Sequence, residues 1–385
     1  MLSECLEFSP ANDAELFAAI PASPAVFLLR SDNPQSEPYI SKTANLRRRL
    51  QRLLGPPTEH SKKLNLRELV RSIEFTATGS DFESGFLLYK LLRLTFPQKY
   101  SDRLRLRPAP FVKMHMENPY PRASVTTRIG RSGSSLYYGP FRSRAAAEKF
   151  ANDSLDAFKM RRCVDDLHPD PQFPGCIYSE MKMCLAPCFK GCTNDDYRAE
   201  VNRVVAYFDS GGDTLVREIA AQRDQASASM EFERASELHA RLEKLKPILA
   251  QLPEIVRRLD QLAGILVQPS ANPSCVTFFR IDGGCLAGPA TFSIQSAEHT
   301  KSQSMESRIQ ESLATLPPVP ARSSAELMEH LAILKRWYYR GTRVGEIFLA
   351  DRKGELPFRR IVRGVARVYH GEQPDPERDK DPIQP

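Results

Sequence analysis

Residues 38–50, PYISKTANLRRRL, contain the end of a strand followed by a basic helix, and the N-terminal fold can be followed outward from them. Tyr39 and Lys42 lie where the strand ends, and three consecutive arginines follow within two helical turns: Arg47, Arg48 and Arg49. Residues 42–71 hold nine Lys or Arg against two Glu, an excess that suits a polyanion. Such a helix can grip a phosphate backbone, activate a phosphodiester, or be a solvated face, and the pattern alone leaves all three open.

The segments on either side complete a small α/β unit of about 100 residues. Residues 24–30 (PAVFLLR) and 37–42 (EPYISK) are expected to be short strands around a turn rich in Asn, Pro and Ser. A helix is expected at 43–54, ending at GPP, then a strand at 71–78 and a helix at 81–94 before a proline.

The bulk composition indicates a globular protein of several domains. A chain of 385 residues is too long for one ordinary core. Hydrophobic residues make up 41% and charged residues 26%, the net charge is +7, and no apolar run reaches the roughly 20 residues that span a bilayer. The acidic N-terminus lacks the pattern of a signal peptide, so a cytoplasmic protein is expected.

The remaining segments extend the prediction to an α+β multi-domain protein. Strands are expected at 124–129 and 135–141, a helix at 143–161, and an amphipathic helix in the segment NDDYRAEVNRVVAYFDSGG. A long helical segment at 214–249 is expected to bend near SMEFERA. Strands at 263–268, 274–294 and 344–350 follow, with a DGG turn and a helix at 324–340 among them.

Five of the eight cysteines fall within 30 residues, with the spacing C-x12-C-x7-C-x3-C-x3-C. In a reducing compartment such a cluster favours a metal site over disulfides, and four thiolates suffice for zinc or for an iron–sulfur cluster. The paired C-x2-C knuckles of a zinc ribbon are absent from the sequence. Spacing alone does not decide the metal, and free core cysteines are the alternative. The five are Cys163, Cys176, Cys184, Cys188 and Cys192.

Three stretches resemble one bacterial family, the UvrC proteins of excinuclease ABC, which are the incising component in nucleotide excision repair. SLYYGPF with MRRCVDD…GCIYSEMKMCLAPC resembles the family's cysteine region, and MEFERASELHARLEKL resembles the UVR motif through which UvrC contacts UvrB. The first 100 residues resemble its GIY-YIG nuclease domain, so the likeness covers roughly residues 20–250. The resemblance implies a four-iron, four-sulfur cluster on Cys163, Cys176, Cys184 and Cys188, with Cys192 as a bystander or substitute and zinc as the alternative metal.

The resemblance also implies a division of the chain into five parts. These are a degenerate GIY-YIG-like domain at 1–105, a cysteine-rich region at 106–210, a UVR helical hairpin at 211–252, a C-terminal α+β domain at 253–370 and a disordered Pro-rich tail at 371–385. About 135 residues follow Ala250, and they contain no stretch resembling the Asp-Ile-Ser-His of the family's RNase H-like nuclease. That nuclease and the helix–hairpin–helix units are therefore expected to be missing.

At the nuclease motif the resemblance is partial. Tyr39, Lys42 and Arg49 match family positions, which implies that they orient or accept a proton, neutralise the phosphate and stabilise the phosphorane charge. Arg47, Arg48 and Arg52 are then expected to contact DNA. Five family positions are substituted: Ala25 stands for a glycine, Phe27 for a tyrosine, Ser41 for a glycine, Tyr89 for the single metal-binding glutamate and Ser101 for an asparagine.

The loss of the glutamate removes the main anchor for Mg²⁺ or Mn²⁺, because divalent ions need hard oxygen ligands. Glu83 lies about 240° around an ideal helix from position 89, and Asp81 is two turns away, so neither is a ready replacement. Metal-dependent cleavage is therefore expected to be impaired.

Three functions remain open. The first is a repair module that binds DNA and UvrB without cutting, with partner contacts from Phe232, Leu238, Leu242 and Leu245 unless these pack within their own hairpin. The second is an active, shortened endonuclease of the Cho type that makes a single incision. The third is an iron–sulfur nucleic-acid-binding regulator outside repair.

Overall fold

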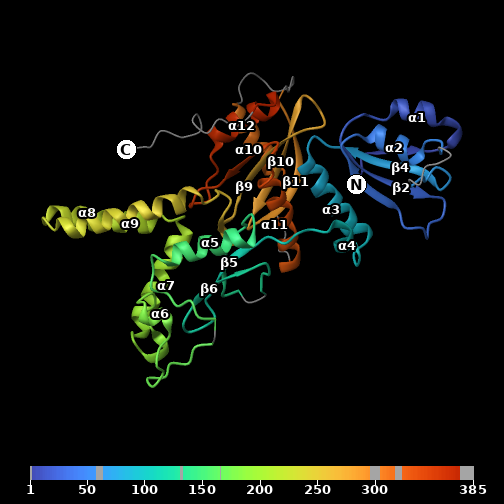
Figure 1. Cartoon of the computed structure of the whole chain (residues 1–385). Coiled ribbons are helices and arrows are strands. Elements are labelled where there is room, and N and C mark those ends of the chain that lie inside the picture. The colour runs from blue at the N-terminus through green and yellow to red at the C-terminus, as the bar shows by residue number, and fades with distance from the viewer. Residues whose placement is uncertain are drawn as a thin grey trace.

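The computed structural model describes residues 2–57, 64–130, 133–164, 166–294, 304–316 and 323–372. Within these ranges the chain forms three four-stranded sheets, and every strand pairing is antiparallel. Helices cover the sheets, and two helical projections leave the body (Figure 1). The predicted α+β class is confirmed.

The first sheet has the order β1-β4-β2-β3. The face of this sheet that α1 and α2 cover forms an apolar core, which includes Phe27, Leu29 and Phe75 of the sheet. The predicted strands and the α2 helix are confirmed, whereas β1 and α1 were not expected from the sequence. The elements are β1 (Glu4–Glu7), α1 (Asp13–Ala19), β2 (Ala25–Ser31), β3 (Tyr39–Thr43), α2 (Leu46–Leu54) and β4 (Val70–Ala77), with a 3-10 turn at Pro10–Asn12.

Helix α3 (Asp81–Thr95) lies between the first sheet and the rest of the molecule (Figure 1). Its Leu91 packs on Val26 and Leu28 of β2. Its opposite face, with Phe82 and Phe86, belongs to the large central core. The short helix α4 (Tyr100–Leu104) follows. One helix therefore fastens the N-terminal unit to the C-terminal half.

The second sheet has the order β6-β5-β7-β8, and α5 packs on it. Strand β8 comes from beyond the helical hairpin, so the chain returns to complete this sheet. Strand β5 lies in a Pro-rich stretch where no strand was predicted. The elements are β5 (Phe111–His115), β6 (Arg122–Thr126), β7 (Leu136–Gly139), α5 (Arg144–Leu155), α6 (Ile177–Glu180), a 3-10 turn at Pro187–Phe189, α7 (Asn194–Asp209) and β8 (Arg257–Arg258).

Helices α8 (Asp213–Ala228) and α9 (Phe232–Ala250) form an antiparallel arm that projects from the body (Figure 1). The chain reverses at Met230, which has a left-handed φ of 61°. This turn falls within the predicted SMEFERA bend, which is confirmed.

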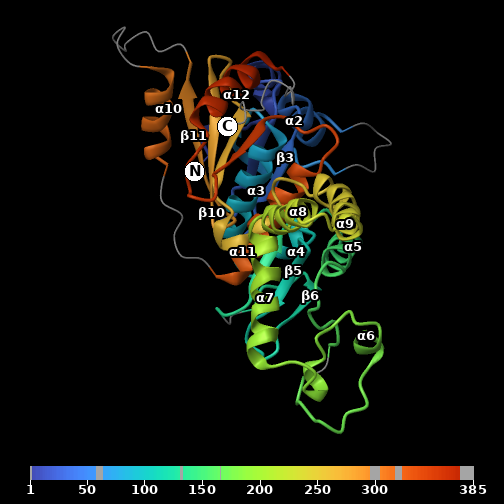
Figure 2. The same ribbon diagram turned by 90° about the vertical axis from the view of Figure 1, so that its left-hand side faces the viewer.

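The third sheet has the order β11-β10-β9-β12, with α10 and α12 on one face and α11 on the other. Figure 2 shows α10 and α12 beside these strands, and α6 with its loop far from them. The elements are a 3-10 turn at Leu259–Gln261, β9 (Gly264–Pro269), β10 (Cys275–Asp282), β11 (Cys285–Ser293), α10 (Met305–Ala314), α11 (Ser324–Tyr338), β12 (Glu346–Leu349) and α12 (Phe358–His370).

The largest apolar core is continuous from α3 through the second sheet and the arm to α11 and the third sheet. It therefore crosses the predicted boundaries at 105, 210 and 252, so those boundaries do not separate independent cores. Most of the predicted tail, residues 373–385, lies outside the described residues. None of the helices in the described ranges is long and apolar enough to cross a membrane.

Candidate functional site

Tyr39 and Arg49 come together on the face of the first sheet that α2 covers. Asn45 caps α2 by accepting a hydrogen bond from the Arg48 backbone N–H at 2.9 Å, which fixes the helix start beside the end of β3. Arg49 Nη2 then donates to the Tyr39 hydroxyl at 2.8 Å. The Phe27 ring lies 6.1 Å from the Tyr39 ring and is fully buried, so a second hydroxyl is missing at this point.

Lys42 points to the opposite face of the same strand, because side chains alternate across a sheet. In the register of β3 with β2, Tyr39 pairs with Leu29 and Lys42 pairs with Val26. Leu29 belongs to the α2-side core and Val26 to the α3-side core. The structure therefore divides the three retained nuclease residues between two faces of the sheet.

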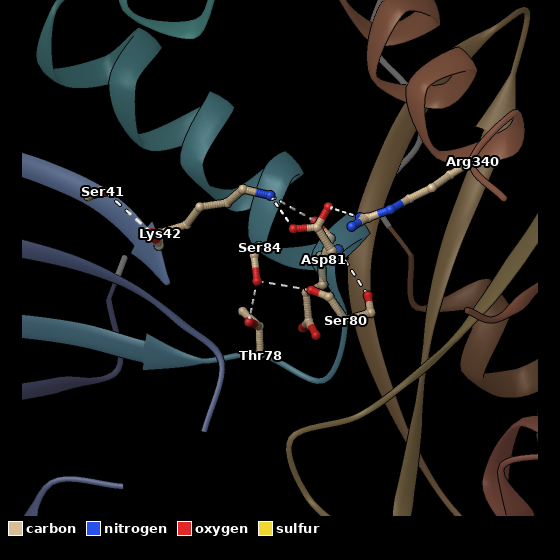
Figure 3. A network of polar contacts seen from close by, with 8 residues as sticks. Ser41, Lys42, Thr78, Ser80, Asp81, Ser84 and Arg340 are labelled. Carbon is tan, nitrogen blue, oxygen red and sulfur yellow. Dashed lines mark hydrogen bonds and ion pairs between the residues drawn. The ribbon is translucent and has the colours of Figure 1, made fainter. Parts of the chain in front are cut away.

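On the α3 side, Lys42 belongs to a polar network with Asp81 and Arg340 (Figure 3). Lys42 Nζ lies 2.5 Å from Asp81 Oδ1, and Arg340 Nη1 lies 2.7 Å from Asp81 Oδ2. Partial burial acts to raise the pKa of Asp81, but the hydrogen bond from Lys42 and the positive charges of Lys42 and Arg340 lower it. Asp81 is thus an ionised partner of two cations.

Tyr89, which was predicted to stand in the place of a metal-binding glutamate, is 1% exposed. Its hydroxyl donates to Glu329 Oε2 of α11 at 2.9 Å and accepts from Arg93 Nη1 at 3.0 Å. Tyr100 donates to the other oxygen of Glu329 at 2.7 Å. Burial and the Glu329 carboxylate raise the pKa of Tyr89, so its hydroxyl stays protonated. Position 89 is a docking contact beneath α11.

The other candidate carboxylate on α3 is also engaged. Glu83 Oε2 accepts a hydrogen bond from the Gly79 backbone N–H at 2.8 Å, and burial raises the pKa of Glu83. Ser101 is exposed on α4. Among the described residues, no group of three or more His, Cys, Asp or Glu side chains is arranged to hold a metal ion.

Of the three arginines predicted to contact DNA, one is used inside the fold. Arg47 donates to the backbone carbonyls of Ile20 at 2.8 Å and Ala18 at 3.1 Å, so it closes the end of α1. Arg48 and Arg52 are exposed on α2. These two arginines, on the outer face of α2, remain in reach of a phosphate backbone.

Four of the five clustered cysteines line one small cavity: Cys163, Cys176, Cys184 and Cys188. Cys192 is not among the lining residues. The backbone winds tightly here, since Lys182, Ala186 and Lys190 all adopt left-handed φ angles of 56° to 59°. Non-glycine residues in this region of φ carry strain that surrounding structure must impose.

The donors around this cavity suit sulfur ligands. Arg161 Nη1 donates to Cys163 Sγ and the Ala186 backbone N–H donates to Cys184 Sγ, both at 3.3 Å. Such N–H···S contacts stabilise a metal-bound thiolate. Burial and the neighbouring thiols raise the pKa of Cys184 to about 11, so this thiol needs a cation to ionise. The donor set fits a thiolate-bound metal, although the sulfurs are not arranged at ligand positions in the described structure.

The four residues predicted to contact a partner divide into two groups. Leu238, Leu242 and Leu245 are 4–6% exposed and pack in the core between α9 and its neighbours. Phe232 is 68% exposed at the tip of the arm, beside Met230, which is 76% exposed. The tip therefore presents an apolar surface, and the leucines hold the arm together.

The sequence analysis missed the cations that α11 brings to Lys42. Arg336 and Arg340 lie one turn apart on or just after α11, and they line a cleft with Lys42, Asp81 and Arg103. The i, i+4 spacing of the two arginines in RWYYR was the available signal. The partner face on α3 is more than 200 residues earlier in the chain, so the sequence does not show where that helix docks.

Two family models match parts of this chain. Residues 109–207 match the family model of the UvrC/Cho excinuclease middle domain, a range that includes β5, β6 and β7 of the second sheet and the cysteine region. Residues 213–246 match the UvrB/UvrC motif, which spans the arm. These matches confirm the predicted resemblance for the central part of the chain.

Curated proteins named UvrABC system protein C are among the relatives that this chain matches. The protein of Carboxydothermus hydrogenoformans is 27% identical over 283 residues, covering 73% of this chain and 46% of the relative. That of Xanthomonas campestris pv. campestris strain B100 is 26% identical over 361 residues, covering 89% and 57%. The chain is thus similar to these proteins over most of its own length, and it spans about half the length of the curated relatives it matches. No solved structure matches it.

Proposed function

We propose that this chain is a nucleotide-excision-repair module that binds DNA and UvrB, and that its GIY-YIG-like site is impaired for cleavage. The UvrC-like relatives and the UVR motif support the repair role. The main support for impaired cleavage is Tyr89, which is buried under α11. The resemblance assigns this position to the family's metal-binding glutamate.

The chemistry follows from what the retained residues can do. Cleavage of a phosphodiester needs a positioned base, stabilisation of the phosphorane charge and, in this class, a metal held by a carboxylate. Arg49 can pair with a phosphate oxygen, and the Tyr39 hydroxyl, which already accepts from Arg49, keeps its own proton to donate. Both residues therefore bind and orient a phosphate, while the two carboxylates nearest on α3 are held by Lys42, Arg340 and the backbone.

A nicking assay tests this proposal. The purified protein is incubated with a lesion-bearing duplex and Mn²⁺ or Mg²⁺, with and without UvrB, beside Tyr39→Phe and a matched Tyr369→Phe control on α12. We expect binding without incision in every sample. Nicking that disappears only in Tyr39→Phe would establish the second candidate, a Cho-like single-incision endonuclease, which the intact Tyr39–Arg49 pair favours.

For UvrB, we place the contact at the tip of the arm. The exposed Phe232 offers an apolar anchor, and such anchors dominate binding when they become buried in an interface. Phe232→Ala is expected to weaken capture of UvrB by roughly tenfold or more, whereas Leu94→Ala, an exposed residue of α3, leaves it unchanged. Absence of any binding by the unaltered chain would favour a regulator outside repair.

We further propose that Cys163, Cys176, Cys184 and Cys188 hold an iron–sulfur cluster and that Cys192 stays outside it. The shared cavity supports this set of four. When bound, the cluster would supply a covalent link between the loops that carry these residues. The chain's own contribution is the pair of N–H donors to sulfur and the tight turns that present Cys184 and Cys188.

A further inference from the structure

A cleft lies where the N-terminal unit meets α11, and we call it the junction cleft. Its walls come from β3, α3, the segment around α4 and the end of α11. The apolar part of its lining includes Leu88, Leu104 and Trp337. The ionisable lining residues are Lys42, Asp81, Arg103, Arg336 and Arg340.

The charge of the junction cleft is unbalanced, with four cations and one carboxylate in its lining. Asp81 divides its two oxygens between Lys42 and Arg340 (Figure 3). The positive charge of Arg336 also lowers the pKa of Asp81. Arg103 Nη2 lies 2.5 Å from Glu37 Oε2, and Glu37 is not among the residues that line the cleft. The excess of positive charge in a partly enclosed cleft favours an anion.

Stability of the fold does not account for this arrangement. The side chains of Asp81 and Arg340 are each 52% exposed, and ion pairs that exposed contribute little to the stability of a fold. The cations come from three distant parts of the sequence and converge only because α3 docks on α11. Arg105 and Arg107 are both exposed on the segment after α4.

We propose that the junction cleft binds a backbone phosphate of DNA through Lys42, Arg336 and Arg340, and that Asp81 is an internal anion which this phosphate displaces. The inference rests on the proposed DNA binding and adds a specific place for it. Arginine forks match phosphate oxygens in two parallel hydrogen bonds, and Lys42 adds a compact charge. In the absence of DNA, Asp81 pairs with Lys42 and Arg340, and the DNA phosphate replaces it as their partner.

The test measures affinity for a labelled short DNA duplex by fluorescence anisotropy across a salt series. The double variant Arg336→Gln/Arg340→Gln is expected to bind about tenfold more weakly, with a salt slope smaller by about 0.9 because one phosphate contact is lost. Asp81→Asn is expected to bind more tightly than the unaltered protein, because the competing anion is gone. Arg144→Gln/Arg217→Gln, which removes two arginines that are 62% and 75% exposed on α5 and α8, is the charge-matched control and leaves binding unchanged.

Each contrary outcome has a definite meaning. Unchanged affinity in the double variant overturns the junction cleft while leaving DNA binding in place, and failure of the unaltered protein to bind DNA overturns both. Weaker binding by Asp81→Asn overturns the displaced-anion role. If inorganic phosphate at constant ionic strength raises the melting temperature of the unaltered protein but not of the double variant, and DNA affinity is equal in both, the cleft binds free phosphate rather than DNA.

Discussion

The N-terminal unit and the cysteine region were both predicted from a resemblance to the UvrC family, yet the fold arranges their motif residues differently. Four cysteines spread over 26 residues line a single cavity. In the N-terminal unit, Tyr39 and Arg49 meet on one face of the sheet, Lys42 lies on the other, and Tyr89 is buried under a helix of another unit. A retained motif residue is therefore evidence of function only where its partners also reach the same place.

The largest effect is expected at the cysteines. Cys184→Ser removes one of the four proposed ligands, so we expect loss of bound iron and of the visible absorption of the proposed cluster, because four thiolates are needed. Cys192→Ser is the matched control and keeps both. Iron, zinc and acid-labile sulfide are measured beside the absorption spectrum. Equal loss in both variants would contradict the proposed difference between Cys184 and Cys192. Zinc without iron would show that the bound metal is zinc.

A smaller effect is expected from restoring the family residue at position 89. Tyr89→Glu places a second carboxylate beside Glu329 in a buried position, so the free energy of unfolding should fall by about 3–5 kcal/mol without any gain of nicking. Tyr89→Phe, which only removes the hydroxyl, should cost about 1–3 kcal/mol. Denaturant unfolding and the nicking assay measure the two properties. Metal-dependent nicking by Tyr89→Glu would show that the nuclease-like site needs only this one side chain.

The smallest effect concerns the pH dependence contributed by Asp81. Because Lys42 and Arg340 lower its pKa in the folded chain, this ion pair stabilises the fold above the ordinary pKa of 3.8 and loses that contribution as pH falls through the lower folded value. Exposure limits the contribution to less than about 1 kcal/mol. The unfolding free energies of the unaltered protein and Asp81→Asn should therefore differ near neutral pH and converge in acid. If the two unfolding free energies still differ in acid, the effect of Asp81→Asn comes from the shape of the side chain and not from its charge.

Much of the secondary structure could be predicted from the sequence, because it depends on local signals. Alternation of apolar residues predicted β4, short apolar runs predicted β2 and β9, and a Gly-free segment predicted the helices of the arm. Strand β5 was missed because it lies among prolines, and β1 because its four residues pair with β4 about 70 residues away. Such pairing leaves little trace in a short strand's own sequence.

The candidate sites divide in the same way. The sequence by itself determined which residue types were available: five close cysteines, a Tyr–Arg pair ten residues apart, and tyrosine where a carboxylate was expected. Spacing also set Tyr39 and Lys42 on opposite faces, because three residues along a strand is an odd number of steps. Only the tertiary structure decided that α3 docks on α11. That contact buries Tyr89 against Glu329 and brings Arg336 and Arg340 to Lys42, and it depends on the packing of apolar faces more than 200 residues apart.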